Sequence, residues 1–148
     1  MKRLSAILLG AALCLCARNM QASGIGSAET QGKSIYVMGD SYVRNHKRPA
    51  AETWHAKAAA RLGMDYHNLG INGNCIAFDR TDRGFGVRMT ERIREIPADA
   101  DFILIIAGHN DATMADTDEK FASFTDSLHC LCARLKENHP RADSYTHL

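Results

Sequence analysis

Three short polar motifs contain residues that could carry out nucleophilic chemistry on an ester. They are Gly39-Asp40-Ser41, the pattern Asn68-x-Gly70-x-x-Gly73, and Gly108-His109-Asn110-Asp111. A serine hydroxyl that attacks an ester builds an oxyanion, which two or three preorganised hydrogen-bond donors must stabilise. The candidate nucleophile is Ser41. The candidate donors are the backbone N–H groups of Ser41 and Gly73 and the side-chain amide of Asn110.

Each motif directly follows a segment that is predicted to be a β-strand. The predicted strands are Ser34 to Met38, Asp65 to Leu69 and Asp101 to Ala107, and the predicted helices run from about Ala50 to Leu62, Val87 to Glu95 and Glu119 to Asn138. This alternation predicts an α/β domain with a parallel sheet. Ligands bind outside the carboxyl ends of such strands, so the three motifs are expected to meet at one edge of the sheet.

The third predicted strand is apolar on both faces, which is typical of a central parallel strand covered by helices. The chain after Pro140 has a different character, because Arg141 to Leu148 is short and polar. We expect this tail to lie outside the sheet, so that the C-terminal strands of the architecture are missing. The third strand would then have an unpaired edge, which is an aggregation liability.

Taken together and in this order, the three motifs resemble those of the SGNH hydrolases, also called the GDSL esterase family. The resemblance extends from Lys33 to Pro140. It implies a flavodoxin-like, three-layer α/β/α sandwich around a parallel sheet. It also implies removal of acyl groups from lipids, sugars or small esters, with no metal and no other cofactor.

The resemblance assigns a role to each polar residue. Ser41 is implied to be the nucleophile, and Gly73 and Asn110 to complete an oxyanion hole with the Ser41 N–H. Asp40 and Asp111 are implied to support their loops. Without the resemblance, Asp40 and Ser41 would also suit a helix N-cap turn, and Asn110 could cap the segment that follows it.

The sequence departs from the family pattern at the catalytic acid and base. The family takes both from a late Asp-x-x-His, and we expect this motif to be missing from the chain. Asp143 and His147 are one residue too far apart for that motif, and His109 is expected to be structural. Losing the base of a catalytic triad lowers turnover by roughly a millionfold in another serine hydrolase. Two hypotheses therefore remain: a serine esterase, or a truncated, non-catalytic remnant or ligand-binding domain.

The first 22 residues have the pattern of a secretory signal peptide. Two basic residues precede an apolar run from Leu4 to Ala17, which is shorter than the about 20 residues of a transmembrane helix. We expect cleavage after Ala22 and a secreted or periplasmic, incomplete esterase domain over residues 33 to 148, with no stable transmembrane segment. A lipid anchor at Cys14 or Cys16 is the alternative.

Charge and composition exclude several classes of partner. The formal net charge is +1, and loss of the predicted signal peptide would remove three basic residues and no acidic ones, which gives −2. A nucleic-acid partner is therefore not expected, and the expected substrate is a small-molecule or carbohydrate ester, with acetyl the first candidate. No glycine-rich phosphate loop follows the first strand, which disfavours a nucleotide binder. The residues expected in the core include Trp54, Cys75, Cys130 and Cys132.

Overall fold

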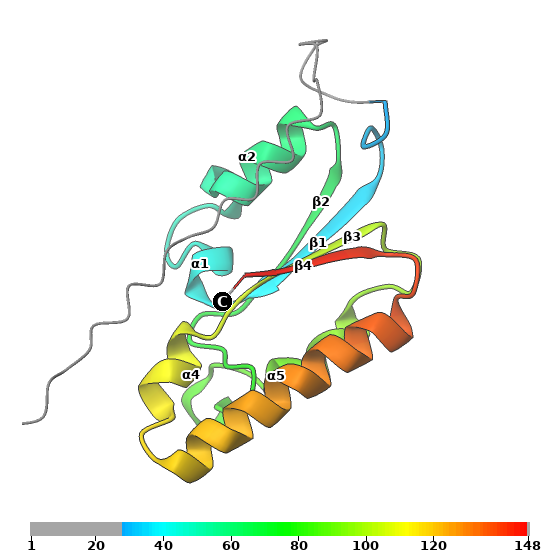
Figure 1. Ribbon diagram of the computed structural model, residues 1–148. Helices are drawn as coiled ribbons and strands as arrows, with labels where there is room; N and C mark the ends of the chain where they lie inside the picture. Colours follow the sequence, from blue (N-terminus) through cyan, green and yellow to red (C-terminus); the bar gives the residue numbers. More distant parts are fainter. Residues whose placement is uncertain (1–27, 148) are drawn as a thin grey trace, which may run out of the picture.

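A sheet of four parallel strands forms the middle of the computed structural model, which describes residues 28–147 (Figure 1). The strands are β1 (Ser34–Gly39), β2 (Asp65–Gly70), β3 (Phe102–Ile106) and β4 (Asp143–His147), in the spatial order β2-β1-β3-β4. The predicted parallel sheet is thus confirmed. The predicted signal peptide, including Cys14 and Cys16, lies outside the described residues.

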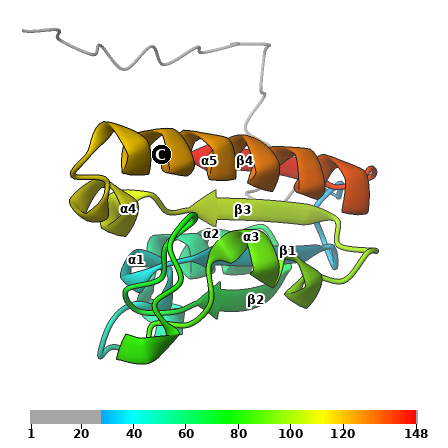
Figure 2. The same ribbon diagram turned by 90° about the horizontal axis from the view of Figure 1, so that it is seen from below.

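Helices cover both faces of the sheet, which confirms the predicted three-layer arrangement (Figures 1 and 2). One face carries α1 (Ser41–Arg44), η1 (Ala50–Glu52) and α2 (Trp54–Arg61), and the other carries α3 (Met89–Arg92), η3 (Ile93–Glu95) and α5 (Asp118–Asn138). The short elements η2 (Thr81–Arg83) and α4 (His109–Met114) belong to the loops that follow β2 and β3.

The main core lies between the sheet and the layer of α3, η3 and α5. Ile103 and Ile105 alternate along β3 with less buried residues, so one face of this strand contributes to the core. On α5, Leu131 and Leu135 are buried, whereas Phe121 in its first turn is 61% exposed. Burying an aliphatic side chain of this size contributes about 1.5–3 kcal/mol, so the C-terminal half of α5 holds the layer in place.

The polar tail after Pro140 forms a strand, so the expectation that it lies outside the sheet is wrong. β4 pairs in parallel with β3, with Asp143 opposite Phe102 and His147 opposite Ile106. The edge of β3 offers backbone N–H and C=O groups whatever side chains its partner carries. The tail also contains tyrosine and threonine, which favour strands. β3 is therefore a central strand, as predicted, and its edge is paired.

Several side chains predicted for the core lie at the surface. Trp54 is 65% exposed, Cys132 is exposed and Cys130 is half-buried, whereas Cys75 is fully buried as expected. Trp54 is the first residue of α2 and lies outside its buried face. That buried face is formed by His55, Ala56 and Ala59. The prediction that Trp54 is a core residue is therefore wrong, because its position on the helix, and not its hydrophobicity, decides its exposure.

Candidate active site

The register of the sheet brings the ends of β1, β2 and β3 to one level. Gly39 lies opposite Gly70 in β2 and opposite Ile106 in β3. The residues that follow these three positions begin the three polar loops. The motifs therefore share one edge of the sheet, as predicted.

Two glycines allow α1 to sit directly on the strand ends. A Cβ atom on Gly39 would overlap the carbonyl oxygen of Ile106 and the Cγ2 of Val43. A Cβ atom on Gly70 would overlap the backbone nitrogen of Arg44. Val43 is fully buried at this contact. The close packing fixes where α1 begins relative to the other two loops.

Ser41 is the first residue of α1 and follows its N-cap residue, Asp40. The Oδ1 of Asp40 accepts the N–H of Tyr42 at 2.9 Å, and its carbonyl accepts the N–H groups of Val43 and Arg44. The N–H and the hydroxyl of Ser41 have no hydrogen-bond partner among the described residues. The N-cap reading of this tripeptide is thus correct, and it is compatible with a reactive serine.

Gly73 lies in the loop after β2 with a φ of +73°. A Cβ atom here would come within 2.6 Å of the Phe85 ring. The guanidinium of Arg80 lies over that ring, 4.5 Å from its centroid, and donates to the Gly73 carbonyl at 2.9 Å. In the described part of the chain, the Gly73 N–H has no acceptor. It is a second unoccupied donor at this edge.

The side-chain amide of Asn110 connects the three loops. Its Nδ2 donates to the Oδ2 of Asp40 at 3.2 Å and to the carbonyl of Asn74 at 3.1 Å. Both amide hydrogens are used, so an oxyanion would have to share or replace one of these acceptors. Asn110 does not cap α4, because the N-cap residue is Gly108, which has a φ of +103°.

Asp111 holds the loop after β2 rather than its own loop. Its Oδ2 accepts the N–H of Ile76 and its Oδ1 accepts the N–H of Ala77, each at 2.9 Å. The carboxyl is fully buried, and burial raises the pKa of Asp111 although the two N–H groups lower it. Burial also raises the pKa of Asp40. Both aspartates are interior groups that fasten the site loops.

A hollow of about 360 Å³ opens beside the nucleophile position. Its walls include Asp40 and Tyr42, the two neighbours of Ser41. His109 closes another side, and its exposed ring meets the ring of Tyr42 edge-on with 5.7 Å between centroids. The volume is within the range of small-ligand sites. His109 makes no hydrogen bond to Ser41 and is placed here as a wall of the hollow.

No described side chain is positioned as the base for Ser41. Asp143 and His147 lie at opposite ends of β4, with backbone positions roughly 13 Å apart at about 3.3 Å per residue. The expectation that the chain has no Asp-x-x-His is wrong as to spacing, because Asp126-Ser127-Leu128-His129 has it. This string lies in the middle of α5 with Asp126 and His129 exposed.

Cys75 lies next to the site loops but is not a competing nucleophile. It is fully buried, and burial raises the pKa of its thiol to about 11. The reactive form of cysteine is the thiolate, so Cys75 remains a protonated thiol near neutral pH.

The sequence pattern did not indicate Asn74 or Arg92 as site residues. Asn74 is fully buried and Arg92 is 2% exposed. One signal was available, since Arg92 lies at helical spacing from Met89 and Ile96, which are both buried. Arginine is almost never fully buried unless it is paired, so a charge on that face required a partner.

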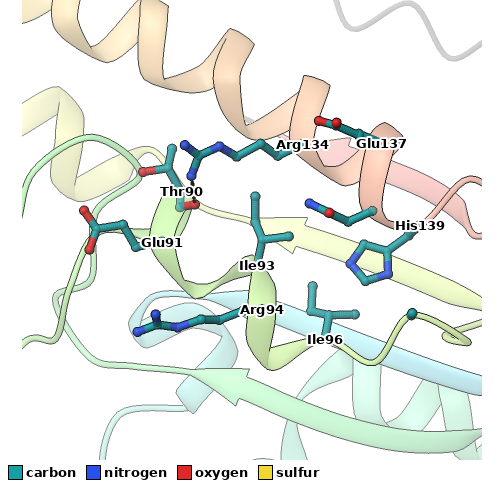
Figure 3. Close-up of a pocket in the computed structure, with 10 residues that line it drawn as sticks. Thr90, Glu91, Ile93, Arg94, Ile96, Arg134, Glu137 and His139 are labelled. Atoms are coloured by element: carbon teal, nitrogen blue, oxygen red, sulfur yellow. Dashed lines mark hydrogen bonds between the residues drawn. The ribbon is translucent and has the colours of Figure 1, made fainter.

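A larger hollow, of about 690 Å³, lies elsewhere (Figure 3). It is lined by residues of α3, η3 and the last turn of α5, including Arg134, Glu137 and His139. The chain runs from η3 into the amino end of β3, so this hollow is at the opposite end of the sheet from Ser41. Size alone therefore does not locate the candidate site.

Two further properties of residues 28–147 bear on function. None of their helices combines the length and the apolar character that a membrane crossing needs. Nor do three His, Cys, Asp or Glu side chains in this part of the chain gather as metal ligands would.

The chain belongs to the GDSL-like lipase/acylhydrolase family, whose family model matches residues 37–147. This confirms the resemblance to SGNH hydrolases, and members of the family are hydrolases. A comparison with curated proteins gave no match.

Solved structures show the same fold. A protein from Lactobacillus plantarum is 27% identical, with a TM-score of 0.64 over 79% of this chain and 56% of its own. AlinE4, an SGNH-hydrolase family esterase, is 17% identical, with a TM-score of 0.61 over 78% of this chain and 58% of its own. A carbohydrate esterase family 2 enzyme with a carbohydrate binding domain, from Corynascus thermopiles (Myceliophthora fergusii), is 18% identical. Its TM-score is 0.60 over 82% of this chain and 46% of its own. The chain thus spans little more than half the length of the first two.

The environment of Gly73 predicts the effect of a methyl group there. We expect Gly73→Ala to lower the free energy of unfolding by about 2–4 kcal/mol, because positive-φ strain adds to overlap with Phe85. The matched control is Gly84→Ala, since Gly84 also has a φ of +73° but has no atom within 4 Å of its Cβ position. The control should lose only about 1–2 kcal/mol. Equal losses in urea unfolding would show that the Phe85 contact is unimportant.

Proposed function

We propose that this chain carries the nucleophile and oxyanion hole of a serine ester hydrolase that acts on carbohydrate or small-molecule esters, with acetyl as the first candidate acyl group. One observation carries the proposal. Among residues 28–147, nothing hydrogen-bonds to the hydroxyl or N–H of Ser41 or to the N–H of Gly73, and the Asn110 amide joins their loops at one sheet edge. A free nucleophile beside free N–H donors is the arrangement that acyl transfer requires.

The proposed reaction proceeds through an acyl-serine. The Oγ of Ser41 attacks the ester carbonyl carbon, its proton passes to a base, and the carbonyl electron pair moves onto oxygen. The N–H groups of Ser41 and Gly73 stabilise this oxyanion, and Asn110 contributes by sharing its amide hydrogens. Collapse breaks the ester C–O bond, and the alcohol leaves with a proton. Water then cleaves the acyl-serine.

The choice of substrate has two supports. The hollow between Tyr42 and His109 has room for a small acyl group, and its walls include both chain neighbours of Ser41, Asp40 and Tyr42. A carbohydrate esterase shares the fold, which makes sugar acetates reasonable first substrates by analogy of fold. We also propose that the chain is exported to the periplasm or outside the cell, on the basis of the pattern of its first 22 residues.

Hydrolysis of an aryl acetate by the purified chain tests the proposal. We expect Ser41→Ala to reduce the rate to background, whereas Ser123→Ala, on the exposed surface of α5, should leave it unchanged. Because no described side chain is positioned as a base, added imidazole should raise the wild-type rate above the rate with Ser41→Ala. Equal rates for wild type and Ser41→Ala under both conditions would contradict catalysis by this chain.

The second candidate function is ligand binding without catalysis, and the absence of a base beside Ser41 among the described residues favours it. An organophosphonate probe separates the two. A covalent adduct that forms with wild type and not with Ser41→Ala, detected by intact-protein mass, supports the hydrolase. Binding of a sugar acetate in calorimetry without any such adduct supports the binding domain.

A further inference from the structure

We propose that Arg92 is a positioning residue for the oxyanion loop, defined here as residues 71–77. Its guanidinium holds this loop in the position relative to Asn110 in which Gly73 and Asn110 can both donate to the same oxyanion. The inference rests on the proposed function, because it concerns the same site.

Arg92 connects the two ends of the segment that carries Gly73. Its Nη2 donates to the carbonyl of Leu69 in β2 at 2.8 Å, and its Nη1 donates to the Oδ1 of Asn74, also at 2.8 Å. Gly73 lies between these two anchor points in the chain. A guanidinium presents its donors in a rigid, planar fork, whereas a lysine ammonium is a point charge on a flexible stem. The fork therefore fixes the distance between the two anchors.

Asn74 links the loop to other parts of the site through its own hydrogen bonds. Its side chain is fully buried, and its Nδ2 donates to the carbonyls of Phe85 at 2.9 Å and Val87 at 2.7 Å. Its backbone carbonyl accepts the amide of Asn110 at 3.1 Å. Phe85 is also the ring that packs against Gly73. A shift of Asn74 would therefore displace both proposed donors.

The burial of Arg92 indicates that stability alone is not its role. Its carboxylate partner is Glu95, at 2.8 and 3.0 Å, and the Glu95 side chain is 40% exposed. A pair with a partly solvated carboxylate offsets only part of the desolvation of a guanidinium, and an apolar residue would often be at least as stabilising. An apolar residue could not make the contacts to Leu69 and Asn74. These contacts are what the guanidinium adds.

Arg92→Lys tests the proposal, with Glu95→Gln as the matched control. Lysine keeps the positive charge and the aliphatic stem but loses the fork, while Glu95→Gln removes the ion pair and leaves the contacts to the loop. We expect amide hydrogen exchange at Asn74, Ile76 and Ala77 to be about tenfold faster or more in Arg92→Lys than in Glu95→Gln, at matched global stability. We also expect kcat for Ser41-dependent hydrolysis to fall by roughly 10- to 100-fold with KM little changed.

The exchange experiment needs no turnover, so it separates this proposal from the proposed function. If wild type hydrolyses no ester, the proposed function fails and exchange still decides the role of Arg92. Unchanged exchange in Arg92→Lys overturns the positioning role whatever the turnover. If Arg92→Lys does not fold, the double variant Arg92→Gln with Glu95→Gln replaces it, because it buries no unpaired charge. Faster exchange in the double variant than in Glu95→Gln supports the positioning role, and unchanged exchange overturns it.

Discussion

Gly39→Ala is expected to lower the free energy of unfolding by about 3 kcal/mol or more. The added methyl group would overlap the backbone carbonyl of Ile106 and the buried side chain of Val43. The carbonyl belongs to a central strand that is paired on both sides, so it cannot rotate away as a side chain could. Either β1 and β3 separate locally or α1 is displaced, and both outcomes would move Ser41.

Urea unfolding checks this expectation, with Gly32→Ala as the control. The same methyl group at Gly32 would have no atom within 4 Å, so its loss should be limited to the strain of a φ of +75°, about 1–2 kcal/mol. A Gly39→Ala protein as stable as Gly32→Ala would show that the strand ends can separate without loss.

Asp111→Asn is expected to reduce Ser41-dependent ester hydrolysis by roughly 100-fold, since small misplacements of site groups have effects of this size. Both carboxylate oxygens accept buried backbone N–H groups, from Ile76 and Ala77. Asparagine has one oxygen, so its NH₂ group would face one of those donors. The loss of one buried acceptor costs about 1–3 kcal/mol. Relief from burying a charge offsets part of this, so the net loss of stability should be smaller than the loss of activity.

The same variant should change the pH dependence of stability. Burial raises the pKa of Asp111, so the folded protein retains a proton that the unfolded chain has released. The free energy of unfolding therefore decreases as pH rises from the unfolded-state pKa to the raised folded-state pKa. We expect a shallower decrease in Asp111→Asn than in wild type. Asp126→Asn, on the exposed surface of α5, is the control and should leave both slope and turnover unchanged.

Much of the fold could be predicted because the buried strands are marked by composition. β1 and β3 are short apolar runs, and their neighbours have helical periodicity, so their order and direction followed. β4 could not be found in this way. Its residues are mostly polar, and its tyrosine and threonine favour a strand only weakly. What places them in the sheet is the row of backbone hydrogen-bonding groups along β3.

The location of the candidate site could be predicted from the sequence, but the side-chain contacts that hold its loops together could not. Polar residues after strands indicated where Ser41, Gly73 and Asn110 lie. The contact of Asp111 with the loop after β2 joins residues more than thirty positions apart, and the contact of Arg92 with Asn74 joins two helix-loop elements. Such contacts depend on how whole elements pack against each other, which a single sequence does not show. The one signal in the sequence is the charged Arg92 on an otherwise apolar helix face.

The central place of β1 has a consequence for biosynthesis. β1 is the first strand to be made, yet Gly39 closes against Ile106, which leaves the ribosome much later. At about 5–20 residues per second, several seconds of translation separate the two. During that interval the turn around Ser41 lacks its contact with β3. The proposed nucleophile, Ser41, is therefore synthesised early in the domain, and its loop gains the contact with β3 only later.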